Sequence, residues 1–473
     1  MTRNFVLSCA VFCLTVGAAV GGPADYLKQP DTWFAGDDAK QVAANILSYQ
    51  SELGGWPKNV DTTAAAYTGD RKDLRPTYDN GATTDELRFL ARIYTVTQDS
   101  AYRTALDRGL AYVLKGQYPN GGWPQYYPPP ARTYHRHITF NDNAMVRLLQ
   151  FVRDVATMSG YAFVEAGRRK DCAAAFNRGI GCILKCQIKV GDKLTAWCAQ
   201  HDEADYRPRP GRSYELTTMS GAESVGITRL LMSLDDPPPE VVRAVEGAAA
   251  WFESVKLTGI RVATVEDESG PKGTNKVVVE DPAAPPLWAR FYSIETNRPV
   301  FSDRDGVAKS TLAEIGYELR NHYAWYGTWP RQLLDSEYPA WKKRIATKMG
   351  RRHGKFGPPN HPLPGLKPGD VAHQAVEHTH DSVLRYGELA GCEPLIAGVM
   401  RNLCGTDEAT GACMVSRLWQ HFAALISAGE VWIRGSIPTD ARQQNPKPES
   451  SNPEPRPQRL QTTLQCGSPV VFS

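Results

Sequence analysis

The chain has 473 residues, of which 42% are hydrophobic and 22% are charged, and its formal net charge is +3. These values are typical of a soluble globular protein with an ample core, and they exclude an extended low-complexity chain. The near balance of charge excludes neither nucleic acid nor an acidic polymer as a ligand. Any anion site must therefore come from local arginines.

The N-terminal segment resembles a secretory signal. Arg3 precedes an apolar run from Phe5 to Val20, and small residues gather near the end of this run. The run is too short for a membrane span with normal flanks. We therefore expect residues 1–22 to be a signal peptide and the protein to be secreted or periplasmic. The alternative interpretation is a buried N-terminal helix.

One motif occurs twice and is partly repeated a third time. Residues 50–56 read Q-S-E-L-G-G-W, and residues 117–123 read Q-Y-P-N-G-G-W. A third version has Gln187 and then, after a longer loop, Trp197. The copies lie about 70 residues apart, which indicates a repeat architecture. We interpret each copy as a helix ending at Gln, a Gly-Gly turn with positive φ, and an aromatic residue that locks the turn.

Helical patterns follow in pairs, and each pair opens on a polar segment. The expected helices begin at residues 77–86 and 100 in the first unit, at 140–145 and about 171 in the second, and at 220–224 and 240 in the third. Strand-like alternation is scarce outside residues 260–280. The pattern predicts an all-α fold, a three-repeat α/α barrel or toroid, with long irregular loops that form the substrate cleft.

The composition changes near residue 348, where we place a domain boundary. Residues 23–347 form the expected main domain, and residues 348–439 form a C-terminal extension of unknown role. Residues 440–473 are rich in Pro, Gln and Ser, which predicts a disordered tail.

Polar residues recur at the starts of the repeat helices. Asp79 and Asn80 precede the first helix pair, Asp142 has the equivalent place in the second, and Glu215 and Glu223 lie near it in the third. Helix capping explains each one separately. In a closed ring of helices, however, these starts would converge on one mouth. Carboxylate and amide oxygens gathered there suit a hard cation such as Ca²⁺.

Arginines accompany aromatic residues in the loops beyond. Arg212 lies on an irregular loop just before the third repeat helix, and Arg290 and Arg298 lie in aromatic loops downstream. Solvated surface arginine is the simple alternative. Guanidinium groups match carboxylates in bidentate geometry, and aromatic rings match sugar faces. A cation site with such neighbours indicates an anionic sugar polymer as the ligand.

A cysteine and histidine group is harder to interpret. Cys182, Cys186, Cys198 and His201 have a spacing that would allow zinc, although the loop lacks a tight knuckle. A disulfide between Cys186 and Cys198 is a second interpretation, since an exported chain permits disulfides. Unpaired cysteines that pack in the core are the third.

Several motifs resemble the pectate lyases of polysaccharide lyase family ten, over about residues 30–345. The motifs are Y-D-N-G-A-T from Tyr78, F-N-D-N-A-M from Phe140, T-A-W-C-A-Q-H-D from Thr195, R-S-Y-E-L from Arg212, S-G-A-E-S from Ser220, the run R-F-Y-S-I-E-T-N-R-P-V-F-S-D-R-D-G from Arg290, and Y-A-W-Y-G-T-W-P from Tyr323. The resemblance implies an α/α toroid that cleaves polygalacturonate by Ca²⁺-assisted β-elimination and releases 4,5-unsaturated oligogalacturonides. Beyond residue 348 we recognise no family pattern.

The resemblance also implies roles for individual residues. Arg212 is similar to the family's catalytic base, and three residues are similar to its acidic and Ca²⁺-handling positions, with Asp79 also contacting the substrate: Asp79, Asn80 and Asp142. Four more are assigned to substrate binding, the first two of them facing its carboxylates: Arg290, Arg298, His201 and Trp123. His201 is also an alternative proton donor. The expected partner is polygalacturonate, with no nucleic acid and no membrane, and the expected state is a monomer.

The chemistry agrees with these residue types. The proton to be removed is on C5, next to the C6 carboxylate, and it becomes more acidic when cations neutralise that carboxylate. Free arginine has a pKa well above ~12, so it is a poor base near neutrality. Ca²⁺ and neighbouring cations would lower that pKa. The sequence therefore predicts an alkaline activity optimum.

Three alternatives stay open. An α/α hydrolase of uronides would use a carboxylate pair, Asp142 with Asp79 or Asp202. The Gln-x3-Gly-Gly-Trp motif also occurs in polyprenoid cyclases, although the chain has no Asp-x-Asp-Asp motif and a signal peptide fits them poorly. A non-catalytic α/α scaffold could bind acidic glycans without cleaving them.

Overall fold

A computed structural model describes residues 22–354 of the chain, with side chains up to residue 348. The predicted signal peptide, apart from Gly22, and the predicted tail at residues 440–473 lie outside the described residues. Almost all of the predicted extension at residues 348–439 does so too. Contacts divide the chain at Phe356 and Gly357. The boundary predicted at residue 348 falls inside helix α11 (Tyr338–Gly354), which continues to the end of the described part.

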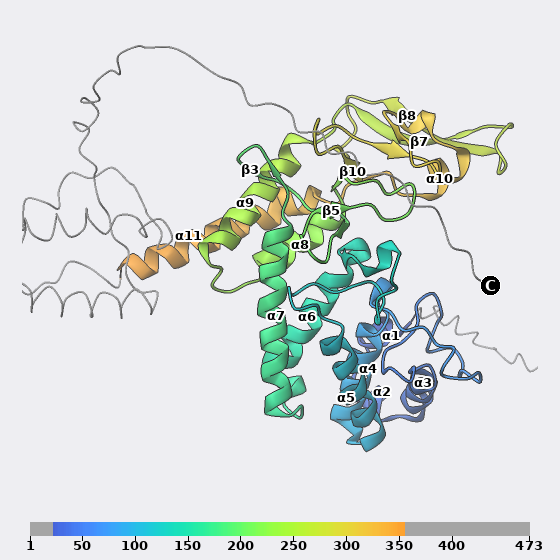
Figure 1. Cartoon of the computed structure of the whole chain (residues 1–473), viewed down its shortest axis with the longest axis vertical. Coiled ribbons are helices and arrows are strands. Elements are labelled where there is room, and N and C mark those ends of the chain that lie inside the picture. The colour runs from blue at the N-terminus through green and yellow to red at the C-terminus, as the bar shows by residue number, and fades with distance from the viewer. Residues whose placement is uncertain (1–21, 355–473) are drawn as a thin grey trace, which may run out of the picture. The chain divides into compact units, whose positions relative to one another are not determined.

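The described part is mostly helical (Figure 1). Its α-helices are α1 (Pro23–Tyr26), α2 (Asp31–Ala35), α3 (Asp37–Ser48), α4 (Thr84–Thr97), α5 (Ser100–Lys115), α6 (Ala144–Thr157), α7 (Ala166–Cys186), α8 (Glu223–Met232), α9 (Pro239–Ser254), α10 (Tyr317–His322) and α11. Short 3₁₀ segments are η1 (Asp79–Gly81), η2 (Tyr134–Arg136), η3 (Asn141–Asn143), η4 (Ser159–Tyr161) and η5 (Leu312–Glu314), and η6 (Leu333–Glu337) is a π-turn.

Strands are short except for one hairpin. Strands β7 (Ile260–Glu266) and β8 (Thr274–Glu280) pair antiparallel with Ile260 opposite Glu280, which confirms the alternation predicted at residues 260–280. The other strands have two residues each: β1 (Ile138–Thr139), β2 (Lys189–Val190), β3 (Lys193–Leu194), β4 (Gln200–His201), β5 (Pro208–Arg209), β6 (Met219–Ser220), β9 (Trp288–Ala289), β10 (Phe291–Tyr292), β11 (Phe301–Ser302), β12 (Ala308–Lys309) and β13 (Tyr326–Gly327).

The predicted helix pairs are present. Helix α4 packs on α5, α6 on α7, and α8 on α9, and each first helix also contacts the first helix of the next pair (Figure 1). The second helices contact one another in the same order. The main differences from the prediction are the earlier start of α7, at Ala166, and the helices α10 and α11, which were not predicted. Among residues 22–354, helices are thus the predominant regular structure, and all the strands except the β7–β8 hairpin are short.

The same pair of glutamine hydrogen bonds occurs in each of the three repeats. Gln50 Nε2 donates to Gly54 O within its own turn and to Ala105 O on helix α5, at 2.8 Å each. The corresponding bonds tie Gln117 to Gly121 O and Ala175 O, and Gln187 to Thr195 O and Ala244 O. Each glutamine therefore fixes its turn to the second helix of the following unit.

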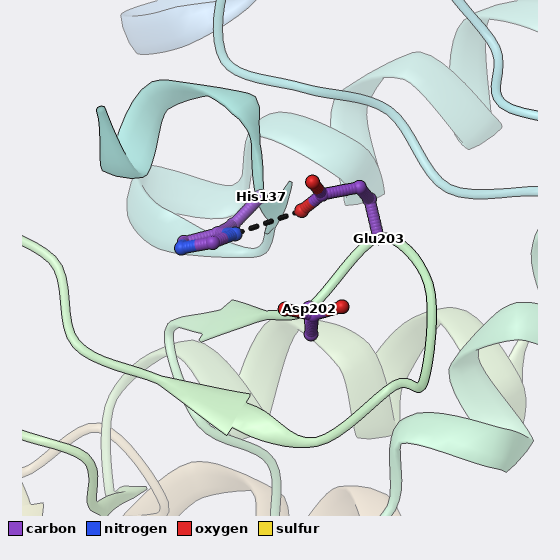
Figure 2. A group of neighbouring side chains, drawn as sticks. All are labelled: His137, Asp202 and Glu203. Atoms are coloured by element: carbon purple, nitrogen blue, oxygen red, sulfur yellow. Dashed lines mark hydrogen bonds and ion pairs between the residues drawn. The ribbon is translucent and has the colours of Figure 1, made fainter. Parts of the chain in front are cut away.

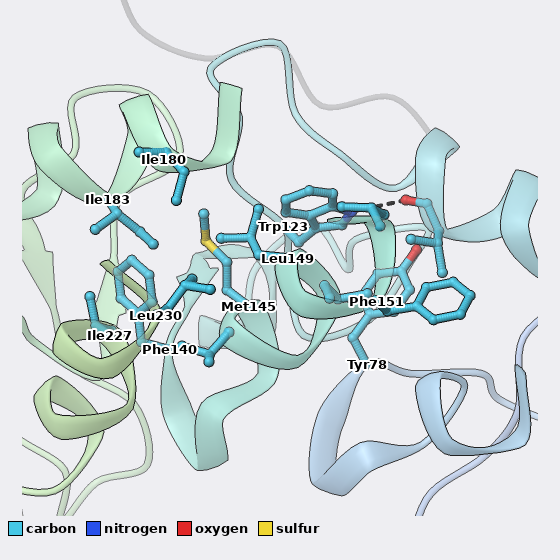
Figure 3. Packing of buried hydrophobic residues seen from close by; sticks show 14 of the residues in the cluster. Tyr78, Trp123, Phe140, Met145, Leu149, Phe151, Ile180, Ile183, Ile227 and Leu230 are labelled. Carbon is cyan, nitrogen blue, oxygen red and sulfur yellow. Dashed lines mark hydrogen bonds between the residues drawn. The ribbon is translucent and has the colours of Figure 1, made fainter. Parts of the chain in front are cut away.

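The repeated tryptophans lock these turns from inside the core. Trp56 Nε1 donates to Ile46 O, Trp123 Nε1 to Val113 O and Trp197 Nε1 to Ile183 O, at 2.7 to 2.9 Å. Trp288 Nε1 bonds Phe252 O in the same way, which adds a fourth copy that the sequence motif did not predict. Figure 3 shows Trp123 among the buried apolar side chains. All four indoles are essentially inaccessible to solvent.

The glycines of the turns have the predicted conformation. Gly54 has φ 104° and Gly121 has φ 94°. A Cβ on Gly121 would lie 2.1 Å from Arg178 O, and one on Gly54 would lie 2.6 Å from Arg108 O. Both the backbone conformation and the close approach of the next unit therefore require glycine.

The backbone carbonyls of the first three tryptophans also fix the segments that precede the repeat helices. Trp56 O accepts a hydrogen bond from Thr77 N, Trp123 O from Thr139 N, and Trp197 O from Ser220 N, at 2.7 to 3.0 Å. The polar helix starts noted in the sequence follow these anchor points directly. No helix among residues 22–354 is both long and apolar enough to cross a membrane.

Candidate active site

The first two polar helix starts contact each other. Segment η1, with Asp79 and Asn80, touches η3, with Asp142, and both contact helix α6. Asn80 has φ 54° and Asp142 has φ 49°, so both lie in the left-handed region that Asn and Asp adopt more readily than other non-glycine residues. The repeat register therefore brings an amide and a carboxylate into equivalent strained turns, one beside the other.

Asp79 is buried, and its Oδ2 already has two partners. Its Oδ2 forms an ion pair with Lys58 and accepts a hydrogen bond of 2.6 Å from Gln125 Nε2. Its side chain is 2% exposed. Lys58 and Gln125 were not predicted, although the repeat register contains the signal, since each follows a Trp-Pro pair at the end of its motif.

Asp142 is the accessible carboxylate of the group. Its side chain is 40% exposed, and its Oδ1 lies 3.7 Å from Arg290 Nη2. Asn141 Nδ2 donates to its Oδ2 at 2.8 Å. Partial burial raises the pKa of Asp142, and the nearby carboxylates of Glu223 and Asp79 raise it further, against the opposing effect of the arginines. Negative charge is therefore crowded here.

Arg290 is held from behind by Glu223, which opens helix α8. The Arg290 guanidinium forms an ion pair with Glu223, whose carboxylate also accepts a hydrogen bond from Ser220 Oγ. Both charged side chains are largely buried. Burial alone would lower the pKa of Arg290, but Glu223, Tyr323 and the other acidic neighbours together outweigh burial and raise that pKa. Arg290 is thus a fixed positive charge with one edge directed at Asp142.

Arg212 has its own buried partner, Glu215. Arg212 Nη2 donates to Glu215 Oε1 at 2.5 Å, and the Arg212 backbone N–H donates to Oε2 at 3.0 Å. Burial would lower the pKa of Arg212, but its bond to Glu215 raises it well above its ordinary value. The Arg212 side chain is 42% exposed while that of Glu215 is 5% exposed. The guanidinium therefore faces solvent with its counter-ion beneath it.

Tyr323 joins the two arginines. The guanidinium carbon of Arg290 lies 5.1 Å from the Tyr323 ring centroid, and that of Arg212 lies 5.7 Å from it. The Tyr323 hydroxyl donates to Glu215 Oε1 at 2.9 Å. Arg212 also acts electrostatically on Asp142. Arg290 and Arg212 therefore share the Tyr323 ring, and Asp142 joins them through its contact with Arg290.

Arg304 is another cation at this place that the sequence did not single out. Its guanidinium carbon lies 5.8 Å from the ring centroid of Tyr214, and Arg212 lies over the same ring at 4.9 Å. Arg304 also pairs with Glu318 on helix α10. Its only sequence signal is its place in the run that begins at Arg290.

Trp123 and His201 are wrong as substrate contacts. Trp123 is fully buried, and its indole N–H is used by Val113 O. His201 is also fully buried; its Nε2 accepts from Cys198 N at 3.0 Å, and its Nδ1 lies 2.7 Å from Tyr206 O. Burial lowers the pKa of His201 to about 4, and both ring nitrogens are engaged within the core, so the ring does not reach a bound sugar.

Arg298 does not join the group. It lies in the exposed turn between β10 and β11, where its carbonyl accepts a hydrogen bond from Ser293 N. Within residues 22–348, no ion pair or side-chain hydrogen bond links Arg298 to the cluster around Tyr323. Its role as a substrate contact therefore stays a prediction.

The cysteine group is structural. Cys172, Cys182, Cys186 and Cys198 are buried free thiols, which excludes the disulfide between Cys186 and Cys198 in this structure. Among the described residues these thiols do not assemble into a metal-binding group with His201. Burial raises the pKa of Cys198, so this thiol is not poised as a thiolate ligand. Packing is the interpretation that holds.

His137, Asp202 and Glu203 bring three ligand-type atoms within 4.8 Å of one another (Figure 2). Their charges are already compensated, because Asp202 pairs with Arg209 at 2.7 Å and Glu203 pairs with Arg136. His137 Nδ1 lies 2.8 Å from Glu203 Oε2. These contacts connect the start of β1 to the loop after β4, and they explain the group without a metal.

The donor set around Asp142 fits a hard cation. Its groups are carboxylate and amide oxygens. Burial is the main cause of the raised pKa of Asp142, and the negative charges of Glu223 and Asp79, which a cation would offset, add to it. Within the described part of the chain, Asp79 and Asp142 do not form a compact three-acid cage with another acidic residue. A cation here would therefore need further oxygen ligands from a bound acidic molecule or from water.

A family described as pectic acid lyase matches residues 50–334. A solved family 10 polysaccharide lyase from Cellvibrio cellulosa is 32% identical, with a TM-score of 0.57 over 68% of this chain and 98% of that one. A mutant of a family 10 polysaccharide lyase from the same organism, in complex with trigalacturonic acid, is 33% identical, with a TM-score of 0.56 over 65% of this chain and 95% of that one. No curated protein matches the chain.

Proposed function

This chain belongs to the pectic acid lyase family and is a polysaccharide lyase, and from that premise we propose that it is an exported, Ca²⁺-dependent enzyme that cleaves polygalacturonate by β-elimination. The observation that carries the proposal is that Arg290 and Arg212 share the Tyr323 ring while Asp142 lies 3.7 Å from Arg290. The arginines suit the carboxylate of an acidic sugar, and the acidic side chains suit a cation that binds together with that carboxylate.

The substrate carboxylate is the group that these residues would recognise. Arg290 is fixed by Glu223 and offers a guanidinium edge beside Asp142, which supports binding of the C6 carboxylate of one galacturonate. Asp142, Asn80 and Asp79 would hold the cation. When bound, Ca²⁺ supplies positive charge that makes the C5 proton more acidic. Arg290 stabilises the negative charge that develops on the carboxylate as the proton leaves.

Arg212 is the proposed base for the C5 proton. Its exposed guanidinium lies beside Arg290 on the Tyr323 ring, which supports a position next to the reacting sugar. Its ion pair with Glu215 works against this role, because it raises the pKa of Arg212. Positive neighbours in the loaded site would oppose that shift. The neutral form gains population as the pH rises, so we propose an alkaline optimum.

The wider architecture belongs to the same proposal. The tandem contacts of the three helix pairs support an α/α toroid, with its loops forming the substrate cleft. We propose residues 23–347 as the lyase domain, export directed by residues 1–22, and a monomer as the working form. The leaving O4 would take its proton from water, since His201 is buried and neutral.

A single absorbance assay tests the proposal. β-Elimination leaves a 4,5-unsaturated uronide that absorbs in the ultraviolet, whereas hydrolysis does not. We expect absorbance to rise when the protein is mixed with polygalacturonate and Ca²⁺, and to stop rising when a chelator is added. New reducing ends without absorbance would favour the uronide hydrolase, and binding without cleavage would favour the non-catalytic scaffold.

A further inference from the structure

A basic and aromatic patch lies beside the Asp79 half of the site. We call it the flanking patch, and its residues are Lys58, Arg75, Tyr126, Tyr134 and His135. The Arg75 guanidinium carbon lies 4.5 Å from the Tyr126 ring centroid, and Lys58 Nζ lies 5.7 Å from it. His135 packs edge-on against Tyr126 at 5.1 Å, and Tyr134 packs against His135 at 4.0 Å. Arg75 and Lys58 therefore share the Tyr126 ring, and the rings of His135 and Tyr134 pack in sequence beside it.

Backbone bonds hold this patch in place. Thr77 and Tyr126 form an antiparallel bridge. Thr77 Oγ1 donates to Gln125 O at 2.6 Å, and Gln125 N donates to His135 O at 2.9 Å. The loops that carry Arg75, Tyr126 and His135 are thus tied to one another. A ligand would meet a surface that is already ordered and would not have to order it on binding.

The charge of Arg75 is uncompensated within residues 22–348. No carboxylate in that range pairs with it, and its guanidinium lies over the face of the Tyr126 ring. Lys58, in contrast, is paired with Asp79. Burial lowers the pKa of His135, and the positive charges of Lys58 and Arg75 lower it further. The patch is therefore electropositive, and Arg75 is its free cation.

Tyr134 connects the flanking patch to the candidate active site. Burial raises the pKa of Tyr134, and the charges of Arg212, Glu215, Lys58 and Asp79 also act on its hydroxyl. The Tyr134 ring is half-buried. Lys58 pairs with Asp79 and also lies over the Tyr126 ring, so the flanking patch directly adjoins the Asp79 half of the site.

We propose that the flanking patch is a subsite for a further galacturonate of the bound polymer, beyond the ring that reacts. Arg75 would bind its carboxylate, and the faces of Tyr126 and Tyr134 would contact its ring. The subsite rests on the proposed function, because it assumes that the substrate is a polygalacturonate chain. It gives the enzyme a preference for long substrates over short ones.

Arg75→Gln tests the subsite, with Lys72→Gln as its matched control. Lys72 lies on the same loop, is exposed and has the same charge, and it has no side-chain partner among the described residues. Binding of polygalacturonate by the intact protein is measured directly at low salt, and KM and kcat are measured on polygalacturonate and on trigalacturonate. Arg75→Gln should weaken polymer binding about fivefold and raise KM on the polymer, with kcat and trimer kinetics unchanged. Arg75→Lys should recover part of the loss.

Two results would overturn the subsite. One is polymer binding by Arg75→Gln that equals that of Lys72→Gln. The other is an equal loss on trimer and polymer, which would indicate a general effect on the fold or on the reacting site. The direct binding measurement keeps the two proposals separate. If the wild type binds polygalacturonate and yields no ultraviolet product, the β-elimination proposal fails while the subsite still stands or falls on the Arg75 comparison. If the wild type does not bind the polymer, both fail.

Discussion

Glu215→Gln is the sharpest perturbation of the proposed base. Glu215 is buried, accepts from Arg212 Nη2 and from the Arg212 backbone, and raises the pKa of Arg212. Glutamine keeps the size of the side chain and removes its charge. The neutral form of Arg212 should therefore become easier to populate, and the rate should reach its maximum at a lower pH.

The size of the shift follows from the geometry. Two unit charges about 4 Å apart interact by about 1 kcal/mol in bulk water and about 4 kcal/mol at an effective dielectric constant near 20. Since the Arg212 side chain is 42% exposed, screening places the pair in the lower part of this range. About 1 kcal/mol corresponds to a little under one pH unit. We therefore expect the ascending limb of the pH profile of kcat/KM, which follows deprotonation of Arg212, to move by about one unit towards neutrality.

The assay is the initial rate of ultraviolet absorbance on polygalacturonate with Ca²⁺, recorded over the neutral and alkaline range. Glu337→Gln is a suitable control, because Glu337 also pairs with an arginine, Arg229, away from the candidate site. It should leave the pH profile unchanged. A profile in Glu215→Gln that does not move, or that moves to higher pH, would refute the reasoning that Glu215 controls the protonation of the base.

Three further predictions follow from other parts of the structure. Ca²⁺ should raise the melting temperature of the wild type near pH 7. At a free Ca²⁺ concentration of about a hundred times the dissociation constant, the rise corresponds to about 2.7 kcal/mol of stability. The rise should be smaller in Asp142→Asn, and an unchanged rise would show that Asp142 is not part of the cation site. Trp123→Phe should lower stability by about 1–3 kcal/mol, because it loses the bond to Val113 O and core volume, with KM on polygalacturonate unaltered; a raised KM at unchanged melting temperature would restore Trp123 as a substrate contact. Glu86→Gln should stabilise the protein at alkaline pH. Burial raises the pKa of Glu86 from 4.5 to about 7, so in this pH range the folded state holds a proton that the unfolded state has released. The wild type therefore loses stability, about 3 kcal/mol in all, as the pH rises from 4.5 to 7. The gain in melting temperature should be present at about pH 8 and absent at about pH 4, and equal gains at both would contradict this account.

The repeats were predictable because they are local. A helix that ends at Gln, a Gly-Gly turn and a Trp form one unit within a few residues, and the bonds of Gln50, Trp56 and their counterparts are the same in each copy. The helices α4, α5, α6, α8 and α9 accordingly lie close to the expected ranges. The fourth buried tryptophan, Trp288, was not predicted, because the segment before it lacks the Gly-Gly turn that marks the first two copies.

The partners within the site were harder to predict, because they come from distant segments. Glu223 and Arg290 belong to helix α8 and to a later aromatic loop, and Lys58 reaches Asp79 from the preceding repeat. Side-chain burial was also invisible in the sequence. Trp123 has the residue type of a sugar platform, yet its indole closes the core.

Arg212→Lys is the measurement that bears most directly on the central claim. The account predicts that product formation, followed by ultraviolet absorbance, collapses in this variant, while its equilibrium affinity for polygalacturonate stays close to that of the wild type, because Lys keeps the positive charge but not the guanidinium geometry. Turnover at the wild-type rate would contradict the assignment of Arg212 as the base.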